Sequence, residues 1–146
     1  MKWEHSAGII PFTEKRKKRK YLLLLSALTR SELWEFPKGL IEKGESAVDA
    51  ASREFQEETG ILEFELVPGF RKVLQYFYRR DGDLIGKRVT YFLAKIKHGQ
   101  AVKISNESKS FAWWTPEEAV KNIRHKNIAQ LMLEAEAFLN RTKARN

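Results

Sequence analysis

The stretch Gly39–Ile61, GLIEKGESAVDAASREFQEETGI, keeps charged residues at a spacing that an ordinary soluble domain has no reason to contain. Five residues separate Gly39 from Glu45, and seven more separate Glu45 from the run Arg53–Ile61, REFQEETGI. An arginine, three glutamates and a glycine thus recur at fixed offsets in a short segment. Such a pattern indicates a site with its own chemistry, and the rest of the chain is interpreted around it.

The second part of this stretch is expected to form a helix. Ser46 is a typical N-cap residue, and Asp49, three positions later, completes a capping-box pattern. The helix should continue to about Thr59, where Gly60 supplies the left-handed position that commonly follows a helix end. Apolar residues at spacings of three and four should face the core; they are Val48, Ala51 and Phe55.

Three carboxylates fall on one turn of this expected helix. Glu54, Glu57 and Glu58 stand at i, i+3 and i+4, so their side chains share one face and repel one another by a few tenths of a kcal/mol per pair. A solvated acidic face would explain the triplet alone. The nearby Gly39 loop and Arg53, which can pair with Glu57 at i+4, favour a divalent cation instead. Oxygen ligands indicate Mg²⁺, with Mn²⁺ possible, rather than zinc.

The complete stretch resembles the Nudix box, G-x5-E-x7-R-E-U-x-E-E-x-G-U, where U is an apolar residue. Every fixed position is filled, and Phe55 is the one departure, because a branched aliphatic residue is more usual there. The resemblance implies an α+β fold of the Nudix type, an α/β/α sandwich. It also implies a reaction, the metal-assisted attack of water on a phosphoanhydride.

The resemblance assigns roles to residues of the box. Glu54, Glu57 and Glu58 correspond to metal ligands, and the Gly39 carbonyl is a possible further ligand. Arg53 corresponds to the residue that orients the carboxylates. The general base differs between branches of the superfamily, so either Glu58 or Glu54 is expected to act as the base. Glu107, in the polar segment before the Trp-Trp strand, remains open as a base or a metal ligand.

Segments outside the box resemble one branch of the superfamily, the bis(5′-nucleosyl)-tetraphosphatases. The resemblance implies asymmetric cleavage of diadenosine tetraphosphate into ATP and AMP. The family often has Glu-His where this chain has Glu107-Ser108, which weakens the assignment of Glu107. The matching segments cover most of the chain: Ser6–Ile10, Trp34–Gly39, Lys87–Ala94, Glu107 with Trp113 or Trp114, and Glu118-Ala119.

A dinucleoside polyphosphate requires cations along a groove and flat apolar surfaces at its ends. Lys38, next to the glycine of the box, is expected to contact a phosphate near the scissile bond. Lys87 and Arg88 resemble phosphate contacts of the same branch. Tyr76 and Tyr78 lie on one face of a strand, so they either stack on adenine or pack across strands. His125 stands where the branch has an aromatic base-stacking residue, and a solvated helix-junction histidine is an equal alternative.

The chain has 146 residues, no cysteine and a net charge of +8, so we expect a single domain, residues 1–146, that binds a polyanion. No apolar run approaches the roughly 20 residues of a membrane helix, and the N-terminus lacks a signal-peptide core, which favours a cytoplasmic protein without a membrane partner. Composition does not indicate the oligomeric state. The basic run Lys15–Lys20 is expected to be a solvated loop, with a phosphate-steering patch as the alternative.

Two other functions remain open. RNA 5′ ends or diphosphoinositol polyphosphates are alternative substrates, and the basic run Lys15–Lys20 favours them. A nucleotide-sensing module without catalysis is a further alternative, but such modules commonly lose carboxylates of the box, and this chain keeps all of them.

The remaining sequence predicts a mixed β-sheet with helices on both faces. Thr115-Pro116 followed by Glu118 is a strong helix start, and a final helix should bury one stripe, Ile128, Leu131, Met132, Ala135 and Phe138. Extended segments are expected at residues 4–12, 20–26, 34–37, 64–67, 70–78, 88–96 and 111–114, with a hairpin turn at 81–83.

Overall fold

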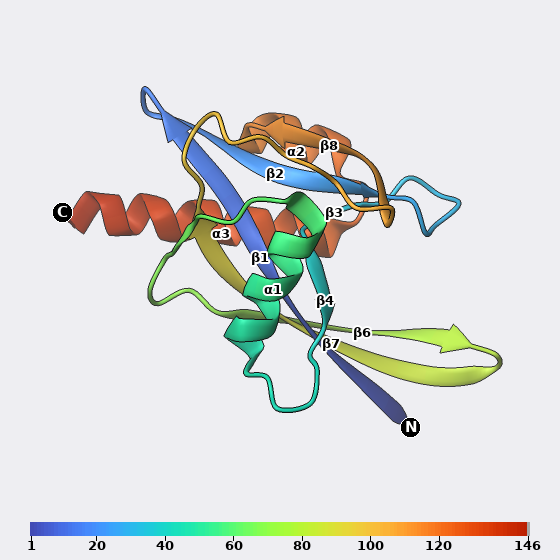
Figure 1. Ribbon diagram of the computed structural model, residues 1–146. Helices are drawn as coiled ribbons and strands as arrows, with labels where there is room; N and C mark the ends of the chain where they lie inside the picture. The colour runs from blue at the N-terminus through green and yellow to red at the C-terminus, as the bar shows by residue number, and fades with distance from the viewer. Residues whose placement is uncertain (146) are drawn as a thin grey trace.

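A mixed β-sheet with helices on both faces forms the protein in the computed structural model, which describes the backbone of residues 1–145 and the side chains of residues 1–143 (Figure 1). Helix α1 covers one face of the sheet, and α2 and α3 cover the other. The predicted α+β sandwich is therefore confirmed. The elements in chain order are β1 (Lys2–Lys15), β2 (Lys18–Ser26), β3 (Trp34–Glu35), β4 (Lys38–Leu40), α1 (Ala47–Thr59), β5 (Glu65–Leu66), β6 (Lys72–Arg80), β7 (Asp83–Lys95), β8 (Ser108–Trp114), α2 (Pro116–Asn122) and α3 (Lys126–Arg145).

Strand β1 is the centre of the sheet. It runs parallel to β7, from the pair Lys2 with Ile85 to the pair Phe12 with Lys95. The short strand β4 pairs antiparallel with β1, so that Gly39 lies opposite Ala7. The main order is β3-β2-β1-β7-β5, while β6 pairs with β7 and β8 pairs with β2. The predicted hairpin of β6 and β7 is confirmed, and its turn is Asp81-Gly82.

The leucine run of β2 is buried on both faces, as four consecutive leucines predict. Tyr21 and Leu23 belong to the core under α2 and α3, whereas Leu22 and Leu24 belong to the core under α1. The two tryptophans of β8 also contact different cores. Trp114 packs against the core under α2 and α3, and Trp113 packs against the core under α1. The stripe of α3 packs as expected, and Phe138 lies edge-on to Phe70. No helix in the described part of the chain is long and apolar enough to cross a membrane.

Helix α1 has the caps that its sequence predicts. Ser46 Oγ accepts a hydrogen bond from the Asp49 N–H at 3.1 Å. Gly60 has φ 72°, and its N–H donates to the Gln56 carbonyl. Val48 was expected in the core but is only partly buried, because the stripe that meets the sheet is centred one position later; its buried residues are Ala50, Ala51, Phe55, Glu58 and Thr59. Because Glu58 is buried together with these apolar residues, the helix face that holds Glu54 and Glu58 lies toward the edge of the sheet.

The basic run Lys15–Lys20 was expected to be a solvated loop; this prediction is confirmed for the exposed residues Lys15–Lys18 and is wrong for Arg19. Lys15 and Lys18 pair across a two-residue turn formed by Arg16 and Lys17, so the run is a β-hairpin. The side chain of Arg19 is only 9% exposed, because it hydrogen-bonds Glu14 and the α3 residues Glu136 and Asn140. Hydrogen bonding between the strands and this ion pair therefore give the run a defined structure. The other strand boundaries differ from the expected ones by a few residues.

Candidate active site

A cavity of about 510 Å³ lies at the edge of the sheet where β4 and α1 meet. Strands β1, β6 and β7 form the opposite wall, and the segment before β8 closes one side. The cavity collects carboxylates and cations from parts of the sequence that are far apart. Its charged or polar lining residues include Glu4, Ser6, Lys38, Glu54, Glu58, Tyr78, Arg80, Lys87 and Glu107, and the Gly39 backbone also borders it.

Two glycines let backbone and side chains approach closely at this edge. A Cβ on Gly39 would lie 2.0 Å from the Glu54 carboxyl carbon, and a Cβ on Gly8 would lie 2.6 Å from the Pro37 carbonyl oxygen. Both distances are shorter than any real Cβ contact. The absence of a side chain at Gly39 therefore places the Glu54 carboxylate directly against the backbone of β4, as the box predicts for a loop that approaches the site.

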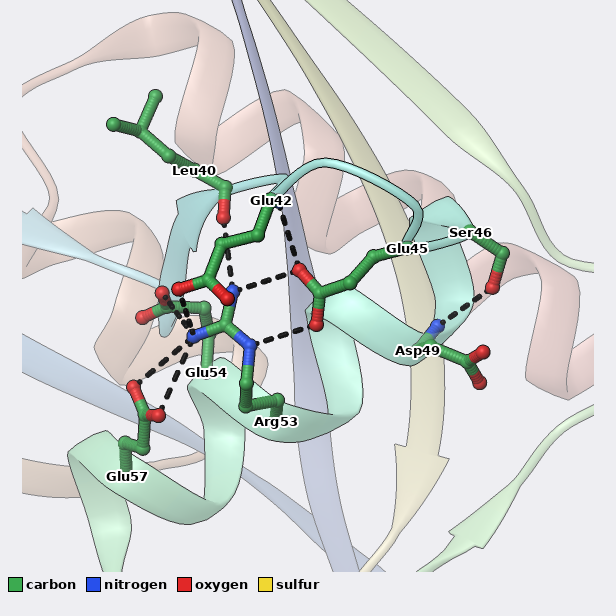
Figure 2. A network of polar contacts seen from close by, with 8 residues as sticks. All are labelled: Leu40, Glu42, Glu45, Ser46, Asp49, Arg53, Glu54 and Glu57. Carbon is green, nitrogen blue, oxygen red and sulfur yellow. Dashed lines mark hydrogen bonds and ion pairs between the residues drawn. The ribbon is translucent and has the colours of Figure 1, made fainter.

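Arg53 joins the loop before α1 to the helix (Figure 2). Its guanidinium donates from Nε and Nη2 to both carboxylate oxygens of Glu45, at 2.8 and 3.0 Å, and from Nη2 to the Leu40 carbonyl at 3.0 Å. Nη1 donates to Glu54 at 2.9 Å and to Glu57 at 3.2 Å. The hydrogen bonds to Glu45, Glu54 and Glu57 raise the pKa of Arg53, so its charge is permanent. The predicted pair with Glu57 is present.

Glu45 is a structural partner of Arg53 that was not among the predicted site residues. It holds Arg53 in two parallel hydrogen bonds, a geometry that fixes both side chains. One of its oxygens also accepts from the Glu42 N–H at 2.8 Å, which closes the loop on itself. Its fixed place in the box was the signal that could have identified it.

Glu58 is the most buried acid of the site, with 9% of its surface exposed. Burial raises the pKa of Glu58 to about 8, and the nearby charges of Glu54 and Glu107 contribute, while Lys38 opposes the shift. Burial also raises the pKa of Glu54, against the influence of Arg53. Three carboxylates that disfavour one another's charge in a partly closed cavity would be stabilised by an additional cation.

The donor set fits a hard divalent cation, although the side chains do not form a complete cage as they stand. No group of three or more His, Cys, Asp or Glu side chains within the described residues is close enough to hold an ion. Glu57 is 57% exposed and turns toward Arg53, away from the cavity lining. A second observation supports a ligand here: Ser6 Oγ borders the cavity, is buried and has no hydrogen-bond partner among the described residues. Ser6 could not be identified as a site residue from the sequence, beyond its place in the segment Ser6–Ile10.

Glu107 lies in the cavity wall, as predicted, but at its exposed side. Its backbone carbonyl accepts from the Ala27 N–H at 2.8 Å, and its N–H donates to Ser105 Oγ at 3.3 Å. These bonds fix the segment before β8, while the carboxylate stays near Glu54 and Glu58.

Lys38 stands between the cavity and a second hollow. Its ammonium lies 3.5 Å from the Glu35 carboxylate, and 15% of the side chain is exposed. Burial disfavours its charge, but Glu35, Tyr76 and Glu58 outweigh this effect and raise the pKa of Lys38. The lysine therefore remains a cation within the wall that separates the two spaces.

The second hollow has a volume of about 300 Å³ and is mainly apolar. It brings together Tyr76 and His125, two residues that the sequence assigned to base stacking, with Lys38 at its border. Strand β6 contributes Tyr76, and the α2–α3 junction contributes His125. The remaining walls are Leu33, Glu35, Tyr91, Asn127 and Ile128.

Tyr78 and Lys87 face the carboxylate cavity from the β6–β7 hairpin. The Tyr78 hydroxyl donates to the Glu4 carboxylate, and Arg80 Nη2 donates to Glu4 at 3.1 Å. Burial and the charge of Lys38 lower the pKa of Lys87. Arg80 borders the same cavity and was not predicted from the sequence, because its orientation depends on the register of the hairpin.

Arg88 does not join the other predicted site residues. It follows Lys87 in β7 and therefore points to the opposite face of the sheet. Its guanidinium donates to Gln75 at 3.0 Å and lies over the Trp3 ring, 5.6 Å from the ring centre. The structure thus places Arg88 outside both spaces.

Comparisons with known proteins agree with this geometry. The model of the NUDIX domain family matches residues 2–135. Bis(5′-nucleosyl)-tetraphosphatase [asymmetrical] of Mus musculus is 34% identical over 125 residues, which are 84% of this chain and 82% of that protein. RNA pyrophosphohydrolase of Campylobacter jejuni is 35% identical over 88 residues, but the match covers only 54% of each protein. A crystal structure of a C. elegans Ap4A hydrolase binary complex has a TM-score of 0.82 and 29% identity, covering 94% of this chain and 98% of that one.

Proposed function

Because the chain belongs to the Nudix hydrolase family, we propose that it cleaves diadenosine tetraphosphate asymmetrically, to ATP and AMP. The main support for this substrate is that two cavities meet at Lys38. One contains carboxylates and cations, and the other is an apolar hollow with Tyr76 and His125. A tetraphosphate chain suits the first space, and a flat adenine suits the second. The mouse and C. elegans relatives, each similar over most of this chain, support the same substrate.

Glu54, Glu58 and the Gly39 carbonyl would hold a magnesium ion, with Glu107 as a further ligand, and Glu57 would join them only after its carboxylate leaves Arg53 and turns into the cavity. When bound, the cation neutralises phosphate charge and makes the attacking water more acidic. Arg53 keeps Glu54 in place by a hydrogen bond of 2.9 Å, whereas its hydrogen bond to Glu57 would have to open for Glu57 to reach the ion. The loop with Glu45 holds Arg53 itself.

In the proposed reaction, the oxygen of water forms a bond to one phosphorus, and the bond from that phosphorus to the bridging oxygen breaks. The electrons of the broken bond stay on the leaving phosphate, whose charge Lys38 and Lys87 would stabilise. A carboxylate of Glu58 or Glu54 would accept the proton of the water, and Glu107 is the third candidate. The aromatic hollow would hold one adenosine and so fix which phosphorus meets the water.

A substrate panel with Mg²⁺ tests the proposal. Diadenosine tetraphosphate should give ATP and AMP in equal amounts, and a reaction in ¹⁸O-labelled water should place the label in one of the two products only. EDTA should stop the reaction, and Mg²⁺ or Mn²⁺ should restore it. Formation of two ADP molecules, or no turnover of this substrate, would contradict the proposal.

An RNA 5′ end is the second candidate substrate. Similarity to RNA pyrophosphohydrolase and the basic hairpin of β1 and β2 favour it. Release of pyrophosphate from 5′-triphosphate RNA, at a higher kcat/KM than the dinucleotide, would select this alternative.

A further inference from the structure

The turn of the β1–β2 hairpin has residues that its backbone does not favour. Arg16 and Lys17 have φ of 53° and 65°, in the left-handed region. A two-residue hairpin turn with both φ values positive prefers Asn-Gly, and each other residue there costs about 1 kcal/mol. Repulsion among six consecutive cations, Lys15–Lys20, adds to this cost. Local stability therefore does not explain the sequence of the turn.

The charges of the hairpin fall into two groups. Arg19 is structural, because its Nη2 lies 2.9 Å from Glu14, and its Nη1 lies 2.7 Å from Glu136 of α3. These bonds attach the hairpin to the last helix. The tip, Lys15–Lys18, is exposed, and none of its four side chains forms an ion pair with any residue whose side chain the structure describes. Four free cations thus project from a fixed support.

The tip lies far from the catalytic cavity. Strand β1 meets β4 at Ser6–Gly8, whereas the turn begins at Arg16, eight residues beyond Gly8. At about 3.3 Å per residue, the separation along the strand is roughly 26 Å. Figure 1 shows the hairpin turn at the upper left, beyond one end of β1, whereas β4 lies beside the middle of that strand. The tip and the catalytic cavity are therefore separate surfaces of the protein.

We propose that the tip, Lys15–Lys18, is an exosite that binds the phosphate backbone of an RNA strand. Four lysine and arginine side chains without protein partners can displace the counterions of several phosphates, which is the main source of sequence-independent binding to nucleic acids. A hollow of about 580 Å³ beside the tip contains Lys20 and Lys143, but Glu14, Glu117, Glu118 and Glu136 also line it, so the proposed phosphate contacts belong to the exposed tip and not to the hollow. No aromatic residue occurs in the run, so base stacking does not contribute.

The composition of the tip favours a nucleic acid over a membrane. Segments that bind membrane surfaces combine basic residues with apolar ones that enter the lipid. The run Lys15–Lys20 has no apolar residue, and Tyr21, which follows it, is fully buried. The exosite does not depend on the substrate of the catalytic cavity.

The test measures binding of a 20-nucleotide RNA with a 5′-hydroxyl, which offers no anhydride to the catalytic site. Fluorescence anisotropy is recorded over a series of salt concentrations for the wild type and for the variant Lys15→Thr, Arg16→Asn, Lys17→Gly, Lys18→Thr. The variant should bind at least about 10-fold more weakly at 0.1 M salt, and its salt dependence should fall by up to about 3 in log-log slope, at about 0.7 per lost phosphate contact. Its melting temperature should not fall, because Asn-Gly suits the turn.

A matched control removes four exposed lysines elsewhere, Lys97, Lys109, Lys121 and Lys126, each to Thr. This control variant has the same net charge as the hairpin variant, and its affinity for RNA should stay within about 3-fold of the wild-type affinity. Hydrolysis of diadenosine tetraphosphate should be unchanged in the hairpin variant, and an excess of a non-hydrolysable analogue should not displace the RNA.

Four results would overturn the exosite: no RNA binding by the wild type, equal weakening in both variants, displacement of RNA by the analogue, or hairpin-dependent binding to anionic vesicles without binding to RNA. None of these results depends on which anhydride the cavity cleaves.

Discussion

The two walls of the active-site cavity are built in different ways. The carboxylate wall comes from one stretch, Gly39–Glu58, and Arg53 connects its loop and helix by hydrogen bonds of 2.8–3.3 Å. The opposite wall, with Lys87, Tyr78 and Arg80, comes from a hairpin whose side-chain hydrogen bonds to the rest of the site, among residues 1–143, go to Glu4. The first wall is preorganised for one reaction, whereas the second can change its residues without disturbing that arrangement. A family with one reaction and many substrates requires this division.

The largest effect is expected from Glu58→Gln on the carboxylate wall. Loss of the charge should lower kcat by about 10³-fold or more, because the residue is a proposed metal ligand and base. The metal-free variant should melt a few degrees higher than the wild type, since an amide is less costly to bury than a carboxylate next to Glu54 and Glu107. Steady-state kinetics measures the change in kcat, and thermal melting in EDTA measures the change in melting temperature. A variant with full activity would remove Glu58 from the mechanism.

Gly39→Ala should have the next largest effect. The added Cβ would occupy the position of the Glu54 carboxyl group, 2.0 Å from its carbon. The carboxylate is the end of a flexible side chain, so the fold should survive with a small change in melting temperature while kcat falls by about 10²-fold. The double variant with Glu54→Ala should be no slower than Glu54→Ala alone. Additive losses would show that Gly39 acts through something other than Glu54.

The carboxylate wall could be predicted from the sequence because its geometry is local. Helix periodicity places Glu54 and Glu58 on one face, and the Ser46 and Gly60 caps set where the helix begins and ends. The predicted core position of Val48 was wrong, because a contact with residues far away in the sequence determines which face of the helix is buried. The core stripe passes Ala50 rather than Val48 because the sheet determines the rotation of α1.

The opposite wall, with Lys87, Tyr78 and Arg80, could be predicted only in part. Alternation along a strand shows that Lys87 and Arg88 face opposite sides, but not which side holds the cavity. That choice follows from the parallel pairing of β7 with β1, which joins Lys87 to Glu4. The register of the β6–β7 hairpin then brings Arg80 to Glu4, and the β1–β4 pairing places Ser6 at the cavity; the sequence pattern alone predicts neither contact. Arg19 was misinterpreted because its anchor, Glu136, lies 117 residues away.

Tyr76 tests the apolar hollow with a moderate effect. Replacing it with Ala should raise KM for diadenosine tetraphosphate by about 10-fold, since stacking of a base on an aromatic ring contributes about 1–3 kcal/mol. Tyr76→Phe keeps the ring and should stay within about 2-fold of the wild type. If both variants lose the same affinity, the hydroxyl rather than the ring is responsible. If Ala lowers only the melting temperature, Tyr76 is a packing residue.

The smallest effect is expected at Arg88, which is compared with its neighbour Lys87. Lys87→Ala should raise KM by about 10-fold, because one charge-assisted contact to phosphate contributes about 1.5 kcal/mol. Arg88→Ala should change KM by less than about 2-fold, since its guanidinium lies over Trp3 on the other face. Each variant loses one positive charge. A general loss of electrostatic attraction would therefore raise KM equally in both variants, and added salt would reduce the effect in both to the same extent. A larger effect of Arg88→Ala would mean that the substrate also contacts the Trp3 face of the sheet, and the division between the two walls would no longer describe this site.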